Sequence, residues 1–78
     1  MNTPGTKQLA AQAEQLYEQQ LKQELEPTHF DKFVAIEPIS GNYYLGASFG
    51  EAIRAARQAH PDRLSHVMRI GRKTALHL

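Results

Sequence analysis

The sequence has no cysteine, which excludes disulfide bonds and any chemistry that needs a thiolate. It has no apolar run near the ~20 residues that a membrane-spanning helix needs. Its first residues show neither the basic nor the apolar segment of a signal peptide. We therefore expect a cytoplasmic protein that does not bind a membrane. No His, Asp and Glu spacing matches a metal site. The sequence therefore predicts no enzyme, no metal, no cofactor and no small-molecule ligand.

The length of 78 residues corresponds to one domain. A chain this short buries only about 60–65% of the surface that it exposes when unfolded. It needs a compact core or the help of a partner subunit to be stable. We expect a disordered leader over residues 1–5, a single α+β domain over residues 6–71 and a tail over residues 72–78.

The first half of the domain begins with one long amphipathic helix over residues 6–26. Thr6 is suited to its N-cap, and Pro27 is expected to end it. Apolar residues recur at spacings of three and four along one face: Leu9, Ala13, Leu16, Tyr17, Leu21 and Leu25. This stripe is longer than a small sheet can cover. We therefore expect part of it to pack against a second copy of the chain.

Short strands and one further helix follow. Aromatic and β-branched runs separated by turn residues predict strands at 32–37, 43–46 and 65–70, with a helix at 48–59. Ser48 and Glu51 form a capping box at the start of that helix. The order is α-β-β-α-β, and the crossover helix implies that strands two and three run parallel. We expect a three-stranded sheet in the order 2-1-3 with both helices on one face.

Reactive groups have structural explanations. Gly46 to Gly50 formally matches the G-x-S-x-G elbow of hydrolases, but Ser48 already has a capping role, and the chain is too small for the large sheet that the elbow needs. His60 lies near Asp62 and His66 in sequence, and we interpret it as the end of a helix, where it can interact with the last carbonyls.

Charge is unevenly distributed along the chain. Residues 1–47 carry three basic and six acidic side chains, a net charge of −3, whereas residues 48–78 carry six basic and two acidic ones, a net charge of +4. Such a split can indicate an anionic partner for the basic half. It can equally indicate two halves that face each other, within one chain or across a dimer, and we favour that interpretation.

Two family patterns resemble parts of this sequence. Phe33-Val-Ala-Ile36, Gly41, Tyr43 and Gly46-Ala-Ser48-Phe-Gly-Glu51-Ala52 resemble the core of HicB-type antitoxins. That resemblance implies a partial double-stranded-RNA-binding-domain-like fold that binds and blocks a small toxin. Lys32 to Ile36, Glu51-Ala52 and Val67-Met-Arg69-Ile70-Gly71 resemble, more closely, small bacterial and archaeal proteins of unknown function. This second resemblance supports the fold and implies no activity.

The leading hypothesis for function is a small interaction module, antitoxin-like or regulatory, that binds another protein or itself as a homodimer. Its contact surface would be the helix stripe or the second strand, with these residues: Leu9, Leu16, Tyr17, Leu21 and Tyr44. The alternative is nucleic-acid binding through the basic C-terminal half, with these residues: Arg54, Arg57, Arg69, Arg72 and Lys73.

Overall fold

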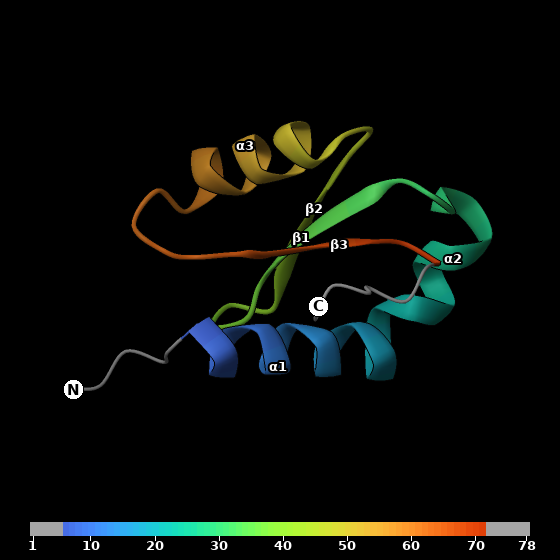
Figure 1. Cartoon of the computed structure of the whole chain (residues 1–78), viewed down its shortest axis with the longest axis horizontal. Helices are drawn as coiled ribbons and strands as arrows, with labels where there is room; N and C mark the ends of the chain where they lie inside the picture. The colour runs from blue at the N-terminus through green and yellow to red at the C-terminus, as the bar shows by residue number, and fades with distance from the viewer. Residues whose placement is uncertain (1–5, 72–78) are drawn as a thin grey trace.

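The computed structural model describes residues 6–71, which form an α+β fold (Figure 1). The predicted order α-β-β-α-β is confirmed, because the first three helical segments are continuous and form one N-terminal helix over residues 6–29. The predicted leader and tail lie outside the described residues. In chain order the elements are α1 (Thr6–Leu16), the π-helix η1 (Tyr17–Leu21), α2 (Lys22–His29), β1 (Phe33–Glu37), β2 (Asn42–Gly46), α3 (Phe49–Ala59) and β3 (His66–Arg69).

The three strands form one sheet in the order β2-β1-β3, as the sequence predicts. β1 is central and antiparallel to both neighbours, with Ala35 opposite Tyr44 on one side and Val67 on the other. β2 and β3 consequently run in the same direction, which is the relation expected of two strands joined by a crossover helix.

The prediction that both helices cover one face of the sheet is wrong. Figure 1 shows the sheet between the N-terminal helix and α3. Val34 and Ile36 pack with the N-terminal helix, whereas Ala35 packs with Ala52 and Ala56 of α3. Successive side chains of a strand point to opposite faces, and the central residues of β1 are apolar on both. Each face therefore needs its own cover.

The N-terminal helix also continues past its predicted end. It ends at His29 and contains Pro27, although proline was expected to stop it at Glu26. The last turn is held by side chains, because the Tyr17 hydroxyl donates to Glu26 Oε2 at 2.9 Å and Thr28 Oγ1 donates to the Glu24 carbonyl at 3.3 Å. These side-chain hydrogen bonds within the helix accompany the proline, which removes a backbone donor at this point.

The π-helical turn explains how one face of a long helix stays against the sheet. The buried residues of this helix recur at a strict spacing of four: Leu9, Ala13, Tyr17, Leu21 and Leu25. In an ideal α-helix each such step drifts by about 40° round the axis. The wider turn, in which the Lys22 N–H donates to the Tyr17 carbonyl, removes the drift at its centre. Figure 1 shows the helix changing direction between α1 and α2.

On the other face, α3 approaches β2 closely at Gly46. A Cβ added to Gly46 would lie 2.5 Å from the Ala52 nitrogen and 2.9 Å from the Glu51 carbonyl carbon. Both are backbone atoms, so they cannot move without displacing the helix. Ser48 starts that helix as predicted, accepting a hydrogen bond from the Glu51 N–H at 3.2 Å.

We predict that Gly46→Ala destabilises the protein by about 1–3 kcal/mol, because the new methyl group forces α3 away from β2. Gly50→Ala is the matched control. A Cβ there meets nothing within 4 Å, so stability should stay the same or rise by up to about 1 kcal/mol. Urea unfolding of both variants measures the difference, and equal stabilities would contradict the close approach.

Candidate functional site

An open groove of about 500 Å³ lies between the N-terminal helix and the turn that joins β1 to β2. Its walls carry no charged residue, although 22% of the chain is charged. Ile39 at the turn is 58% exposed. The lining residues are Gln12, Gln15, Leu16, Gln19, Pro38 and Ile39.

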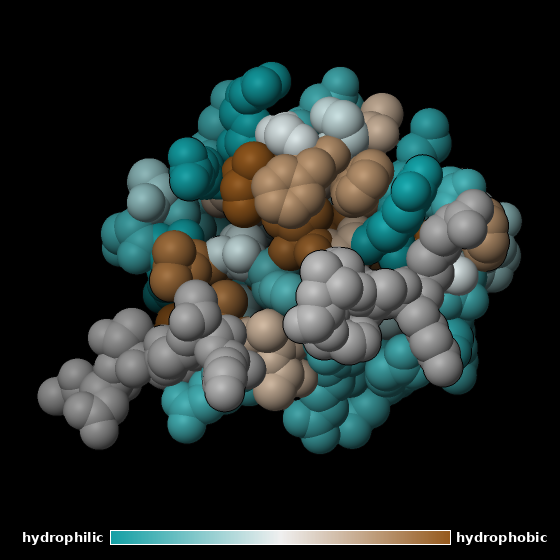
Figure 2. Space-filling model, viewed as in Figure 1, coloured by the Kyte–Doolittle hydropathy of each residue, from teal (hydrophilic) through white to brown (hydrophobic). Residues whose placement is uncertain are grey.

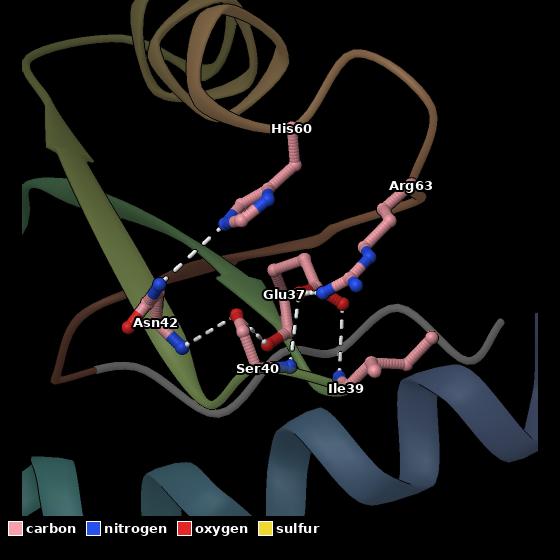
Figure 3. Close-up of polar contacts among 6 residues, drawn as sticks. All are labelled: Glu37, Ile39, Ser40, Asn42, His60 and Arg63. Atoms are coloured by element: carbon pink, nitrogen blue, oxygen red, sulfur yellow. Dashed lines mark hydrogen bonds and ion pairs between the residues drawn. The ribbon is translucent and has the colours of Figure 1, made fainter.

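The turn that forms one wall is held by a single buried carboxylate (Figure 3). Glu37 has no exposed area. Its Oε2 accepts a hydrogen bond from the Ile39 N–H at 2.9 Å, and its Oε1 accepts one from the Ser40 N–H at 2.9 Å. Arg63, from the segment between α3 and β3, donates from Nη1 to Oε1 at 3.2 Å. The position of Ile39 therefore depends on Glu37.

The ionised state of Glu37 is strongly favoured. Burial alone would raise the pKa of this carboxyl group, but hydrogen bonds from Ser40, from the Ile39 amide and from Arg63 outweigh it and lower the pKa to about 2. The carboxylate is thus charged at every pH near neutrality, and the turn keeps its donors paired.

Beside the groove, β2 forms an outer edge of the sheet. The Ile70 N–H donates to the Lys32 carbonyl at 2.8 Å and extends the register in which Val34 lies opposite Met68. Even-numbered residues of β1 therefore bond to β3 and odd-numbered ones to β2, because hydrogen bonding alternates along an antiparallel pair.

The alternation determines which groups of β2 point outward. Asn42, Tyr44 and Gly46 lie opposite odd-numbered residues of β1, so their backbone groups are on the side of β2 that faces β1. By the same alternation, the N–H and C=O groups of Tyr43 and Leu45 point away from β1, on the side where β2 has no neighbouring strand within residues 6–71. β2 is therefore a free edge with two outward-facing residues.

The groove and this edge adjoin, because the turn that lines the groove leads directly into β2. The side chains of Tyr43 and Leu45 lie on the face of the sheet that the N-terminal helix covers. Leu45 and Leu16 are both partly buried against the same core cluster, and Tyr43 is 36% exposed. We call the following residues the uncharged surface: Gln12, Gln15, Leu16, Gln19, Pro38, Ile39, Tyr43 and Leu45.

The structure changes the role of the residues predicted to bind a partner. Leu9, Tyr17 and Leu21 are only 6%, 3% and 8% exposed and belong to the core, so a partner cannot reach them. Burial raises the pKa of Tyr17, whose hydroxyl also accepts a hydrogen bond from the Gly71 N–H at 3.0 Å. Tyr44 is half-buried on the α3 face, and its ring meets that of His60 edge-on. Leu16 alone lies in the groove.

Sequence reasoning missed most of the uncharged surface. Ile39 lies in the turn between the predicted strands at 32–37 and 43–46. An isoleucine in a turn is a sequence signal of an exposed apolar side chain. Tyr43 and Tyr44 lie on opposite faces of the sheet, and it is the backbone of Tyr43 that points away from β1.

The predicted basic residues do not act as one group. Arg54 and Arg57 are exposed on α3 and make no ion pair within residues 6–71. Arg69 contacts Asp31 at 3.6 Å and lies over the Phe33 ring at 5.4 Å from its centre. Arg72 and Lys73 lie outside the described residues.

Ion pairs explain part of the charge split along the chain. Glu37–Arg63 and Asp31–Arg69 each join the acidic first half to the basic second half. His66 Nε2 also lies 3.5 Å from Glu14 Oε2. This agrees with the interpretation that the two halves face each other within one chain.

Other kinds of site are absent from the part of the chain that the structure describes. No three His, Asp or Glu side chains of residues 6–71 lie close enough together to hold a metal ion. Over the same range, no helix has the length and apolar character needed to cross a bilayer.

Comparison of the chain with protein-family models, with curated proteins and with solved structures found no match. The resemblance to HicB-type antitoxins and to small bacterial and archaeal proteins therefore stays a prediction.

We predict that acid weakens the fold through Glu37. Its folded pKa of about 2 lies below the ordinary value of 4.5, so its contribution is complete above pH 4.5 and is lost as the pH falls towards 2. We expect a loss of about 2–3 kcal/mol, somewhat less than the full shift implies because Arg63 is partly in solvent. Urea unfolding at several pH values measures it.

The test variant is Glu37→Gln, which should be less stable at pH 6 and should lose this part of the pH dependence. The matched control is Glu18→Gln. Glu18 forms only an exposed ion pair with Lys22, so its variant should behave as the unaltered chain does. The same pH dependence in all three proteins would contradict the assignment.

Proposed function

We propose that this chain is a protein-interaction module, antitoxin-like or regulatory, that binds a protein partner on the uncharged surface. The observation that carries the proposal is the junction of an apolar groove with a free strand edge. An edge strand offers unpaired backbone groups to another chain, and side-chain pockets beside it supply specificity.

The chemistry of the surface fits a protein partner better than a charged ligand. The centres of protein interfaces are depleted in charged residues and enriched in aromatic ones. The uncharged surface has exposed Ile39 and Tyr43 at its rim and amide side chains along the helix. Its glutamine amides can both donate and accept hydrogen bonds.

Catalysis is not part of the proposal. The groove is lined by amide and aliphatic side chains and has no nucleophile or titratable group, whereas a general acid or base must reach the reacting atoms. The polar cluster around Glu37 has its donors and acceptors already paired.

Nucleic-acid binding has less support. Two of the described arginines, Arg63 and Arg69, already contact carboxylates. Only Arg54 and Arg57 remain of the predicted described set without such a partner, and a few phosphate contacts give weak, salt-sensitive binding.

The test is photo-crosslinking in cells of the native host. Ile39 is replaced by p-benzoylphenylalanine in the full chain, and Arg57, exposed on α3, is replaced in a matched control. Irradiation should yield a covalent adduct with a protein from position 39 and much less from position 57, as mass spectrometry of the adducts would show. No protein adduct at position 39, or equal adducts at both positions, would contradict the proposal.

A further inference from the structure

We propose that the partner is a second copy of this chain, and that two copies pair β2 with β2 antiparallel, with a two-fold axis at Tyr44. The result is a six-stranded sheet with the two β1 strands inside and the two β3 strands at its ends. This inference rests on the proposed function, because it identifies what occupies the uncharged surface.

Hydrogen bonding favours this register. An axis at Tyr44 places Tyr43 of one copy opposite Leu45 of the other, twice by symmetry. These are the two outward-facing residues of β2. In an antiparallel sheet such opposed residues exchange both of their backbone hydrogen bonds, so every free group of the edge finds a partner.

Neighbouring registers leave groups unpaired. An axis at Leu45 would place Tyr43 opposite Ala47, whose N–H already donates to Glu51 Oε1 at 2.9 Å. An axis at Tyr43 would place Leu45 opposite Gly41, which lies in the turn at a φ of +80° and donates to the Glu37 carbonyl. A shift by one residue would oppose outward-facing to inward-facing groups.

Charge explains why the occupant is a copy. A two-fold axis brings a surface against itself, so any charge close to the axis meets its like. β2 reads Asn-Tyr-Tyr-Leu-Gly and the groove beside it carries glutamines, so no charged side chain of the strand or of the groove opposes its own image. A glutamine amide carries both a donor and an acceptor and can pair with the same amide of the other copy.

The opposite edge of the sheet shows the contrast. β3 carries Arg69, whose backbone faces outward and whose guanidinium is exposed. Charged side chains on an edge strand prevent it from pairing with another edge. The two edges of this sheet therefore differ, and only β2 lacks this protection. Figure 2, which views the β3 side, shows an apolar area between α3 and β3 with hydrophilic side chains around it.

Side chains on both faces suit the pairing. On the groove face, Tyr43 and Leu45 of the two copies would lie together, with Leu16 and Ile39 on their flanks. On the α3 face, the axis makes Tyr44 its own neighbour in a non-hydrogen-bonded pair, where side chains are closest. Aromatic pairs at such positions stabilise antiparallel strands.

The first experiment measures the mass of the full chain by size-exclusion chromatography with light scattering. At about 100 µM protein we expect twice the 8.8 kDa of one chain, since association depends on concentration. The mass should be equal at about 50 mM and about 500 mM salt, because neither β2 nor the groove carries a charged side chain that salt could screen. Tyr43→Lys should give a monomer. Leu64→Lys, at a side chain 60% exposed before β3, should leave a dimer.

The second experiment tests the register. The chain has no cysteine, so Tyr44→Cys introduces a single thiol per copy. The Cα atoms of a non-hydrogen-bonded pair lie about 4.5 Å apart, within reach of a disulfide bond. Mild oxidation should link Tyr44→Cys into a dimer rapidly and Val67→Cys, on the β3 edge, slowly. Circular dichroism checks that each variant keeps the fold.

A monomer at every concentration, a dimeric Tyr43→Lys, or equally fast linkage at positions 44 and 67 would overturn the inference. If the chain is monomeric and position 39 nonetheless captures a different protein in cells, the inference fails and the proposed function stands. If position 39 captures no protein and the chain is monomeric, both fail.

Discussion

The central strand β1 is the element on which the rest of the structure depends. Val34, Ala35 and Ile36 have no exposed area, and β1 is hydrogen-bonded on both sides. A strand that is apolar on both faces needs a layer above and a layer below, so the N-terminal helix and α3 must lie on opposite faces of the sheet. With β1 in the centre, β2 and β3 are the two edge strands of the sheet. The contrast between those edges follows from their composition.

A second constraint links the core to the surface. Glu37 continues β1 beyond its apolar residues, and its buried carboxylate is stable only because the turn amides and Arg63 donate to it. A buried charge without such donors would be costly. The same contacts set the position of Ile39 at the groove and join the turn to the segment that leads into β3. The structural role of Glu37 and the shape of the proposed binding surface are therefore inseparable.

Charge separation gives the surface its character. The acidic and basic halves of the chain meet in ion pairs at Asp31–Arg69 and Glu37–Arg63, and His66 lies close to Glu14. None of these pairs lies on the uncharged surface, where glutamines supply the polarity. A small domain has little core to stabilise it, and further burial along a charge-free edge adds apolar contact without opposing like charges.

The sequence by itself determined the local structure. Apolar spacings of three and four and aromatic or β-branched runs between turn residues placed the helices and strands within a few residues, and Ser48 with Glu51 placed the start of α3. The tertiary structure alone decided which face each helix covers, that Pro27 lies within a helix, and that Leu9, Tyr17 and Leu21 are core while Tyr43 and Ile39 are exposed. The physical reason is that periodicity shows which side of an element is apolar, whereas burial depends on which other element packs against that side.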